Sequence, residues 1–281
     1  MSEQTQVQTT VQTTVQTKVQ TKMASKMQYA VYPSLAGKNV VVTGGGSGIG
    51  AEMVRAFALQ GARVFFLDIA EAPARQLEQE LSGSSPAPAF IHCDLTDHGA
   101  LDAAFAGIAQ AHGAVDVLIN NAANDDRHQL GDVTPAYWDQ RMAVNLRHQF
   151  FCAQAVAKGM QAKGGGVILN LGSISWHLAL PNLTLYMTAK AAIEGLTRGL
   201  ARDLGPSGIR VNCVIPGAVR TPRQTELWHT PDEEAKILSE QCLKERVEVE
   251  DVAALVLFLS SDNAARCTGR DYFVDAGWYG V

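Results

Sequence analysis

The sequence has few cysteines, no long apolar run and no excess of basic residues. Its five cysteines are an odd number with no CxxC pair and no histidine cluster at metal spacing, which indicates reduced packing residues and neither disulfides nor a metal site. The chain shows no run of about 18 apolar residues and no secretory signal, so we expect a cytoplasmic protein without a membrane span. The net charge of -5 argues against a nucleic-acid partner.

Hydrophobic residues make up 47% of the 281 positions and charged residues 18%, which allows a sizeable core. Residues 7–22 differ, because they repeat VQTT or VQTK with one apolar residue in four. This composition predicts a disordered tail over residues 1–30 and a single catalytic domain over residues 31–281. Two alternatives stay open: the repeat is a β-prone segment that binds a partner, or the protein starts at Met23 or Met27.

From Tyr32 onward, short β-branched runs alternate with longer helical patterns. This alternation predicts an α/β protein of the doubly wound Rossmann type, with one parallel sheet of about seven strands and helices on both faces. The predicted strands are 39–43, 63–67, 89–92, 115–120, 167–171, 210–215 and 272–274. The predicted helices are 52–60, 72–81, 100–112, 135–163, 185–204 and 249–260.

A glycine-rich turn follows the first predicted strand and precedes a helix. Gly44 permits a tight turn, Gly48 lets backbone N–H groups approach a pyrophosphate, and Gly50 allows close helix packing. The N-terminus of the following helix attracts the anion. The segment therefore predicts a dinucleotide site with contacts from Gly44, Ser47, Gly48, Ile49 and Gly50.

Asp68 ends the second predicted strand, eighteen residues after Gly50. An acidic residue there accepts hydrogen bonds from ribose hydroxyls and repels a 2′-phosphate. No arginine or lysine occurs in the glycine turn or directly after Asp68, so the sequence predicts NAD in preference to NADP. The alternative role for Asp68 is that of a helix N-cap.

Tyr186 and Lys190 form a YxxxK pair, which places the phenol and the ammonium one helical turn apart on the same face. Ser173 lies thirteen residues before Tyr186, and residues 120–123 and 216–221 add two further motifs. Together with the glycine turn, these motifs resemble the short-chain dehydrogenases/reductases over residues 35–281.

The resemblance implies a catalytic set of Asn145, Ser173, Tyr186 and Lys190. Tyr186 would remove the substrate hydroxyl proton, Ser173 would bind the same oxygen, and Asn145 would hold a proton-relay water. Lys190 would bind the nicotinamide ribose and lower the phenol pKa. A strand-end loop cap is the alternative role for Ser173. Beyond the glycine turn and Asp68, the resemblance implies cofactor contacts from Asp94, Leu95, Asn121, Ala122, Tyr186, Lys190, Pro216, Gly217, Val219 and Thr221.

The chemistry of the base sets a condition on its surroundings. The pKa of a phenol is about 10. Lowering it by two to three units requires that the site stabilise the phenolate over the neutral phenol by roughly 3–4 kcal/mol. A solvated lysine at ~4 Å contributes only ~1 kcal/mol. We therefore expect Lys190 to act in a sheltered site, together with the positive nicotinamide ring.

The segments expected to face a substrate are loops beyond the strand ends, at 124–128, 174–183 and 222–243. Their carboxylate, guanidinium and amide groups suit a polyol better than a sterol or acyl chain, with a tryptophan such as Trp176 or Trp228 stacking on the ring. We expect substrate contacts from Asp125, Arg127, Ser173, Ser175, Tyr186 and Gln224. The alternative is that residues 125–127 form a solvated surface cluster.

Five longer strings resemble the bacterial pentose 1-dehydrogenases: YPSLAGK at 32–38, NDDRH at 124–128, GSISWHL at 172–178, QCLK at 241–244 and DAGW at 275–278. The resemblance implies NAD-dependent oxidation of L-arabinose or D-xylose at C1 to the aldonolactone. Between the two sugars we slightly favour L-arabinose over D-xylose as the substrate, although no physical argument separates them. The resemblance also implies a homotetramer, formed through the helices that carry Asn145 and Tyr186 and through the C-terminal strand.

Two other functions remain open. The first is an NAD-dependent dehydrogenase of a sugar acid or another secondary alcohol. The second is a non-enzymatic redox sensor that binds NAD, which the complete catalytic set disfavours.

Overall fold

The computed structural model describes residues 28–228 and 230–280. Almost all of the predicted tail lies outside this range, so its disorder stays a prediction. The chain divides into Met1–Ala30 and Val31–Val281, and the fold below is that of the second unit.

Seven parallel strands form one sheet in the order β3-β2-β1-β4-β5-β6-β7. The reversal of strand order between β1 and β4 is the switch point at which doubly wound folds bind ligands. The predicted fold class is therefore confirmed. The strands are β1 (Asn39–Thr43), β2 (Arg63–Asp68), β3 (Ala89–His92), β4 (Val117–Asn120), β5 (Gly166–Leu171), β6 (Ile209–Pro216) and β7 (Asp271–Val274).

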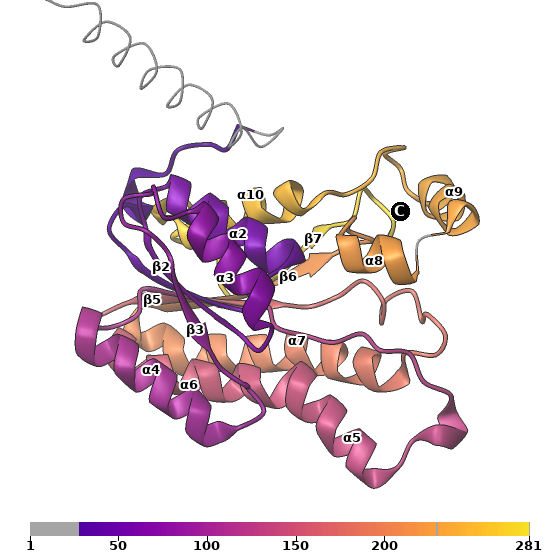
Figure 1. The fold of residues 1–281 in the computed structure, drawn as a ribbon, viewed down its shortest axis with the longest axis horizontal. Helices are drawn as coiled ribbons and strands as arrows, with labels where there is room; N and C mark the ends of the chain where they lie inside the picture. Colours follow the sequence, from indigo (N-terminus) through magenta and orange to yellow (C-terminus); the bar gives the residue numbers. More distant parts are fainter. Residues whose placement is uncertain (1–27, 229, 281) are drawn as a thin grey trace, which may run out of the picture. The chain divides into compact units, whose positions relative to one another are not determined.

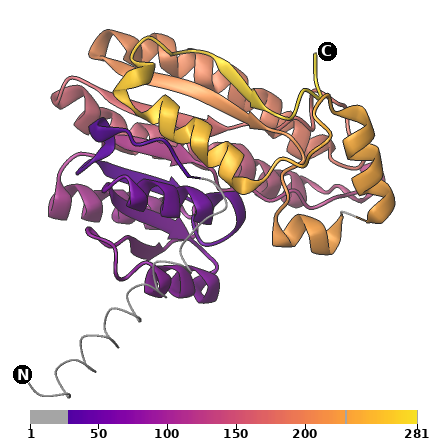
Figure 2. The same cartoon turned by 90° about the horizontal axis from the view of Figure 1, so that it is seen from above.

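Helices cover both faces of this sheet, as Figure 1 shows, with α2, α3 and α10 on one side and α4, α5, α6 and α7 on the other. Figure 2 shows the same fold from above. The helices are α2 (Gly48–Leu59), α3 (Glu71–Glu80), α4 (His98–His112), α5 (Pro135–Met142), α6 (His148–Ala162), α7 (Thr184–Leu204), α8 (Pro222–Leu227), α9 (Pro231–Glu240) and α10 (Val249–Ser260). The short elements are η1 (Pro33–Leu35), η2 (Leu130–Asp132), η3 (Ala143–Arg147), η4 (Gly205–Ser207) and η5 (Asp262–Ala264).

The core is built where the sheet meets α4 and α6. Phe65 and Leu67 from β2 pack with Phe105 of α4 and Met160 of α6, all at most 4% exposed. Burying each such side chain contributes roughly 1.5–3 kcal/mol. This packing holds the strand ends in register and so fixes the edge of the sheet where the candidate site lies.

The predicted helix over 135–163 is interrupted. Residues Ala143–Arg147 form a π-helical stretch, η3, between α5 and α6. Such single-turn π segments occur frequently at functional sites. The interruption falls on Asn145, one of the predicted catalytic residues.

The prediction of loop structure over 222–243 was wrong, because this segment contains α8 and α9. Thr221 and Thr230 accept hydrogen bonds from the backbone N–H groups of Gln224 and Glu233, and a proline follows each threonine. A threonine N-cap followed by proline at the first helical position is a strong helix start signal. The sequence therefore carried the information for both helices.

Within the described residues, no helix is both long and apolar enough to cross a bilayer.

Candidate active site

A cavity of about 770 Å³ lies at the carboxyl ends of the strands. Its lining includes all six predicted substrate residues and, of the four predicted catalytic residues, every one except Asn145. The predicted cofactor residues that line it are Gly44, Ser47, Gly48, Ile49, Gly50, Asp68, Asp94, Leu95, Asn121, Ala122, Tyr186, Lys190, Pro216, Gly217, Val219 and Thr221. The structure thus brings together residues that are up to 180 positions apart, from Gly44 to Gln224.

The glycine turn after β1 is packed too closely for side chains. Gly44 has φ +64° and Gly48 has φ +54°, both in the left-handed region that favours glycine. A Cβ on Gly50 would lie 1.9 Å from the carbonyl oxygen of Gly44. The side-chain amide of Asn121 donates to the carbonyls of Thr43 (3.0 Å) and Gly44 (2.9 Å) and holds the turn. The turn is therefore a backbone cradle at the start of α2, which fits a pyrophosphate.

Asp68 stabilises the same cradle. Its Oδ2 accepts from the backbone N–H of Gly46 at 2.8 Å, and its Oδ1 accepts from that of Ala70 at 2.9 Å. The N-cap of α3 is Ala70, so the alternative N-cap role for Asp68 was wrong. The nearby Arg75 pairs with Glu71 and Glu78.

The remaining cofactor segments are shaped by close backbone contacts. A Cβ on Gly217 would lie 2.7 Å from the Cα of Asp275, so this strand end admits no side chain. The carboxylate of Asp94 accepts from the backbone N–H and the hydroxyl of Thr96, at 2.9 and 2.7 Å. Ala123 also lines the cavity, and it is not among the described non-glycine residues with positive φ, so its backbone is unstrained there.

Helix α7 positions Tyr186 and Lys190 on one face, as their spacing predicts. Lys190 is 1% exposed, and its Nζ donates to the carbonyl of Leu171 at 2.7 Å. The Nζ lies 5.4 Å from the centre of the Tyr186 ring. Ser173 follows β5, and its hydroxyl donates to Ser175 Oγ at 2.9 Å. The serine, phenol and ammonium thus line one end of the cavity.

Burial controls the ionisation of both groups on α7. Burial, and then the negative charge of Asp125, raise the pKa of the Tyr186 phenol, while a hydrogen bond with Ser173 opposes this. Burial lowers the pKa of Lys190 to about 8, against weaker raising effects from Cys213 and Asp125. In the chain alone, the phenol is therefore protonated at neutral pH. This fits the expectation that additional positive charge is required before Tyr186 acts as a base.

Asn145 is fully buried in η3 and does not line the cavity. Its Oδ1 accepts from the backbone N–H of Asn124 at 2.8 Å, and its Nδ2 donates to the carbonyl of Asn124 at 3.0 Å. Both halves of the amide therefore hold the start of the loop after β4.

Trp176 and His177 do not line the cavity, so the expectation that they face a substrate was wrong. Trp176 Nε1 donates to Glu194 Oε1 at 2.7 Å, and His177 Nε2 lies 2.9 Å from the same oxygen. Glu194 is 5% exposed on α7, and a buried carboxylate requires such partners. The two side chains instead fix the Ser173 loop against α7.

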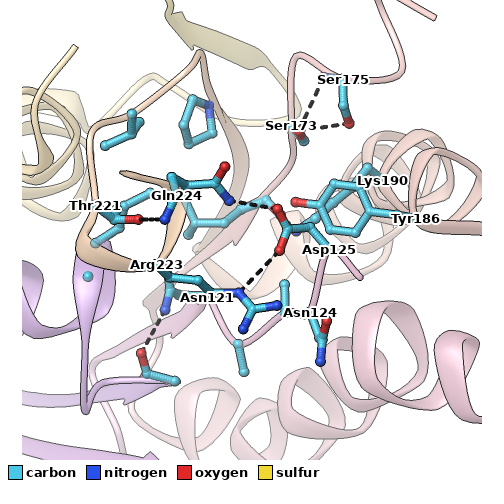
Figure 3. Close-up of a pocket in the computed structure, with 18 of the residues that line it drawn as sticks. Asn121, Asn124, Asp125, Ser173, Ser175, Tyr186, Lys190, Thr221, Arg223 and Gln224 are labelled. Carbon is cyan, nitrogen blue, oxygen red and sulfur yellow. Dashed lines mark hydrogen bonds and ion pairs between the residues drawn. The ribbon is translucent and has the colours of Figure 1, made fainter. Parts of the chain in front are cut away.

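Polar side chains link the loop after β4 to α8, as Figure 3 shows. Asp125 accepts from Gln224 Nε2 at 2.6 Å and from Arg223 Nε at 3.4 Å. Arg127 lies with its guanidinium carbon 4.3 Å from the ring centre of Trp228. Arg223 was not among the predicted site residues, because nothing in the local sequence marks it. Its partner Asp125 is 98 positions away.

Comparison with known proteins agrees with this geometry. A family model described as enoyl-(acyl carrier protein) reductase, of the short-chain dehydrogenase type, matches residues 44–279. The D-xylose 1-dehydrogenase of Caulobacter vibrioides (strain NA1000 / CB15N) is 61% identical over 252 residues, which cover 90% of this chain and 100% of that protein.

Two further proteins are similar to this chain over most of its length. A probable galactose dehydrogenase of Rhizobium meliloti (strain 1021) is 47% identical, over 88% of this chain and 96% of that protein. The solved structure of a 7α-hydroxysteroid dehydrogenase complexed with NADH and 7-oxo glycochenodeoxycholic acid matches with a TM-score of 0.83 and 33% identity, over 89% of this chain and 98% of that one. The chain belongs to the short-chain dehydrogenase/reductase family of oxidoreductases.

Proposed function

We propose that this protein is an NAD-dependent aldose 1-dehydrogenase that oxidises a pentose at C1 to the aldonolactone. The observation that carries the proposal is one cavity with Ser173, Tyr186 and Lys190 at one side and the polar side chains of Asp125 and Gln224 beside them. Carboxylate and amide groups suit a ligand that carries several hydroxyls.

Similarity to sugar dehydrogenases supports the substrate class. The relative at 61% identity is named for D-xylose and the relative at 47% for galactose. For this reason we place D-xylose ahead of L-arabinose, which reverses the slight preference at the level of sequence. Both sugars carry an anomeric hydroxyl, so the proposed chemistry is the same.

In the proposed reaction, the phenolate of Tyr186 accepts the proton of the anomeric hydroxyl while the C1 hydrogen leaves as hydride. Ser173 donates a hydrogen bond to the C1 oxygen and orients it. When bound, the nicotinamide ring supplies the hydride acceptor and a positive charge. Lys190, sheltered beside the phenol, favours its ionised form.

We keep the proposed role of Asn145 in holding a proton-relay water, and we add a proposed structural part in this site. Asn145 fixes Asn124 through two hydrogen bonds and so places the neighbouring Asp125. Asp125, Arg127 and Gln224 are the proposed ligands of the C2 and C3 hydroxyls, and Ser175 is proposed to orient Ser173.

The proposed cofactor is NAD in preference to NADP. Asp68 supports this, because its carboxylate lines the cavity next to the glycine cradle. We expect Asp68→Ser to weaken NAD binding by about tenfold and to narrow the difference between NAD and NADP, since the substitution removes the proposed ribose ligand and the repulsion of a 2′-phosphate. Titration calorimetry with both cofactors measures the change, and a wild-type protein that binds NADP more tightly would refute the assignment.

The proposed function is tested by initial rates of NADH formation with D-xylose, L-arabinose, D-galactose, L-fucose and D-glucose. Wild type and Tyr186→Phe are compared. We expect pentose turnover with NAD that Tyr186→Phe reduces by about 100-fold or more. If every aldose is inactive while a sugar acid or another secondary alcohol is oxidised, the proposed function is wrong and the protein is a dehydrogenase of that alcohol class.

A further inference from the structure

One carboxylate lies next to the proposed base. Asp125 is 21% exposed at its side chain, and its negative charge acts against ionisation of Tyr186. An unopposed carboxylate at this place disfavours removal of a proton by the phenol, because the phenolate would be a second negative charge. The site therefore needs a group that offsets Asp125.

Helix α8 supplies that group. Arg223 Nε lies 3.4 Å from Asp125 Oδ1, and Arg223 Nη2 lies 2.7 Å from Asp126 Oδ1, so one guanidinium bridges two neighbouring carboxylates. The other oxygen of Asp126 accepts from the buried Arg141, at 3.2 Å. Gln224, the next residue of α8, donates to Asp125 without adding charge.

The remaining charges around Tyr186 do not replace Arg223. Lys190 lies on the same helix and donates to a carbonyl, and Arg127 lies over Trp228 instead of against Asp125. Within the described residues, the charged side chains that line this end of the cavity are Asp125, Arg127, Arg141, Lys190, Arg223, Glu233, Lys236 and Glu240. Of these, only Arg223 forms an ion pair with Asp125.

We propose that Arg223 is a positioning residue for the base: by pairing with Asp125 it offsets the carboxylate and favours the ionised form of Tyr186. The base is then strong only when α8 lies against residues 124–128, so the covering of the substrate is coupled to proton removal. This inference rests on the proposed role of Tyr186 and does not depend on which sugar is the substrate.

The test is the pH profile of kcat/KM at saturating NAD for wild type, Arg223→Gln, Asp125→Asn and the double variant. We expect Arg223→Gln to raise the apparent pKa of the acid limb by about 0.5–1 unit, and Asp125→Asn to lower it by a similar amount. In the Asp125→Asn background, Arg223→Gln should shift the acid limb less than it does in wild type, because Arg223 then has only Asp126 left as an ionic partner at this place.

Arg220→Gln is the matched control. Arg220 is 48% exposed at its side chain, against 50% for Arg223, and it pairs with Glu234 and Glu248 outside the cavity lining. Arg220→Gln removes the same positive charge only three residues away from Arg223, and we expect it not to shift the acid limb. The proposal is overturned if the shift in Arg223→Gln is no larger than that in Arg220→Gln, or if it has its full size in the Asp125→Asn background.

A second measurement needs no turnover. The ultraviolet absorbance of the Tyr186 phenolate is titrated with NAD present, as the difference between each variant and the same variant carrying Tyr186→Phe. Inactivity on every aldose would refute the proposed function, and the phenolate titration would still decide on Arg223. An unchanged phenolate pKa in Arg223→Gln refutes the role of Arg223, whatever the enzyme oxidises.

Discussion

At the scale of single residues, the site depends on charges held out of water. Lys190 is almost completely buried, and its Nζ has the Leu171 carbonyl as its hydrogen-bond partner. Burying an ammonium disfavours its charged form, which is why the pKa of this lysine falls to about 8. The same burial makes Lys190 effective on Tyr186, because a charge acts more strongly where water is excluded.

This burial predicts a pH-dependent stability. The pKa of Lys190 is about 8 in the folded chain against 10.5 for the free side chain, so between these values the unfolded chain binds more protons and stability rises with pH. Relative to Lys190→Met, wild type should gain on the order of 2 kcal/mol from about pH 7 to about pH 9.5 without cofactor. Denaturant unfolding at both pH values measures this.

The matched control is Lys158→Met, because Lys158 is an exposed lysine on α6. Its stability difference from wild type should not change with pH. If the difference in unfolding free energy between wild type and Lys190→Met is also the same at both pH values, burial of the Lys190 ammonium does not destabilise the fold.

At the scale of elements, the glycine turn and the Ser173 loop place the two halves of the site. Both are held by side chains that are distant in sequence: Asn121 holds the turn and Glu194 holds the loop. Loops of this kind keep their shape because their polar groups are paired to rigid elements.

The glycine turn gives the second prediction. Gly50→Ala places a Cβ 1.9 Å from the Gly44 carbonyl oxygen, so the turn must move. We expect NAD affinity to fall by about 100-fold or more, because the cradle loses its shape. Calorimetric titration measures the affinity. Gly107→Ala on α4 meets nothing within 4 Å and should bind NAD like wild type. Unchanged affinity in Gly50→Ala would show that the cradle does not hold the cofactor.

Glu194 gives the third prediction. Glu194→Leu leaves the partly buried Trp176 Nε1 and His177 Nε2 without their shared partner, which costs up to about 1–3 kcal/mol for each unpaired group. The Ser173 loop should loosen, and we expect kcat to fall by about tenfold or more while the affinity for NAD is retained. Steady-state kinetics and NAD titration separate the two effects.

Glu194→Gln is the matched variant, because its amide oxygen still accepts from Trp176. It should recover most of the lost kcat. Equal losses in both variants would mean that the charge of Glu194, and not the hydrogen bonds, is what matters.

Much of this element structure could be predicted from sequence. Apolar β-branched runs marked all seven strands to within two residues, because parallel strands are buried on both faces. The π-helical stretch at Asn145 was not predictable from apolar periodicity, since its residues continue the helical pattern. Trp176 and His177 followed Ser173 in the sequence, yet Glu194 on α7 determines where they point.

The pairing of Arg223 with Asp125 is a contact within the site that could not be predicted from the sequence. The chemistry of Tyr186 and Lys190 is local, because both lie on one helix one turn apart, and so their spacing revealed it. The ion pair joins segments 98 positions apart, and only the fold brings them together.

At the scale of the whole molecule, the cytoplasmic location and the homotetramer remain predictions from the resemblance. Exposed aromatic side chains lie on elements expected at the two interfaces: Phe150 on α6 is 43% exposed, and Phe273 on β7 is 38% exposed. Such groups are typical of surfaces that a second chain covers.

The fourth prediction follows from these side chains. The protein should elute as a tetramer in size exclusion with light scattering, and Phe150→Glu should shift it to smaller species by burying a charge in the interface. Lys158→Glu, at an exposed position on the same helix, is the comparison. A monomeric wild type would contradict the predicted assembly.

The central proposal is that the C1 hydrogen of a pentose is transferred as hydride to NAD while Tyr186 accepts the proton of the anomeric hydroxyl. The most direct test uses D-xylose deuterated at C1 with NAD, followed by mass spectrometry of the reduced cofactor. The account predicts one deuterium in each NADH formed, and loss of this product in Tyr186→Phe. NADH without deuterium would place the oxidation at another carbon and contradict the claim.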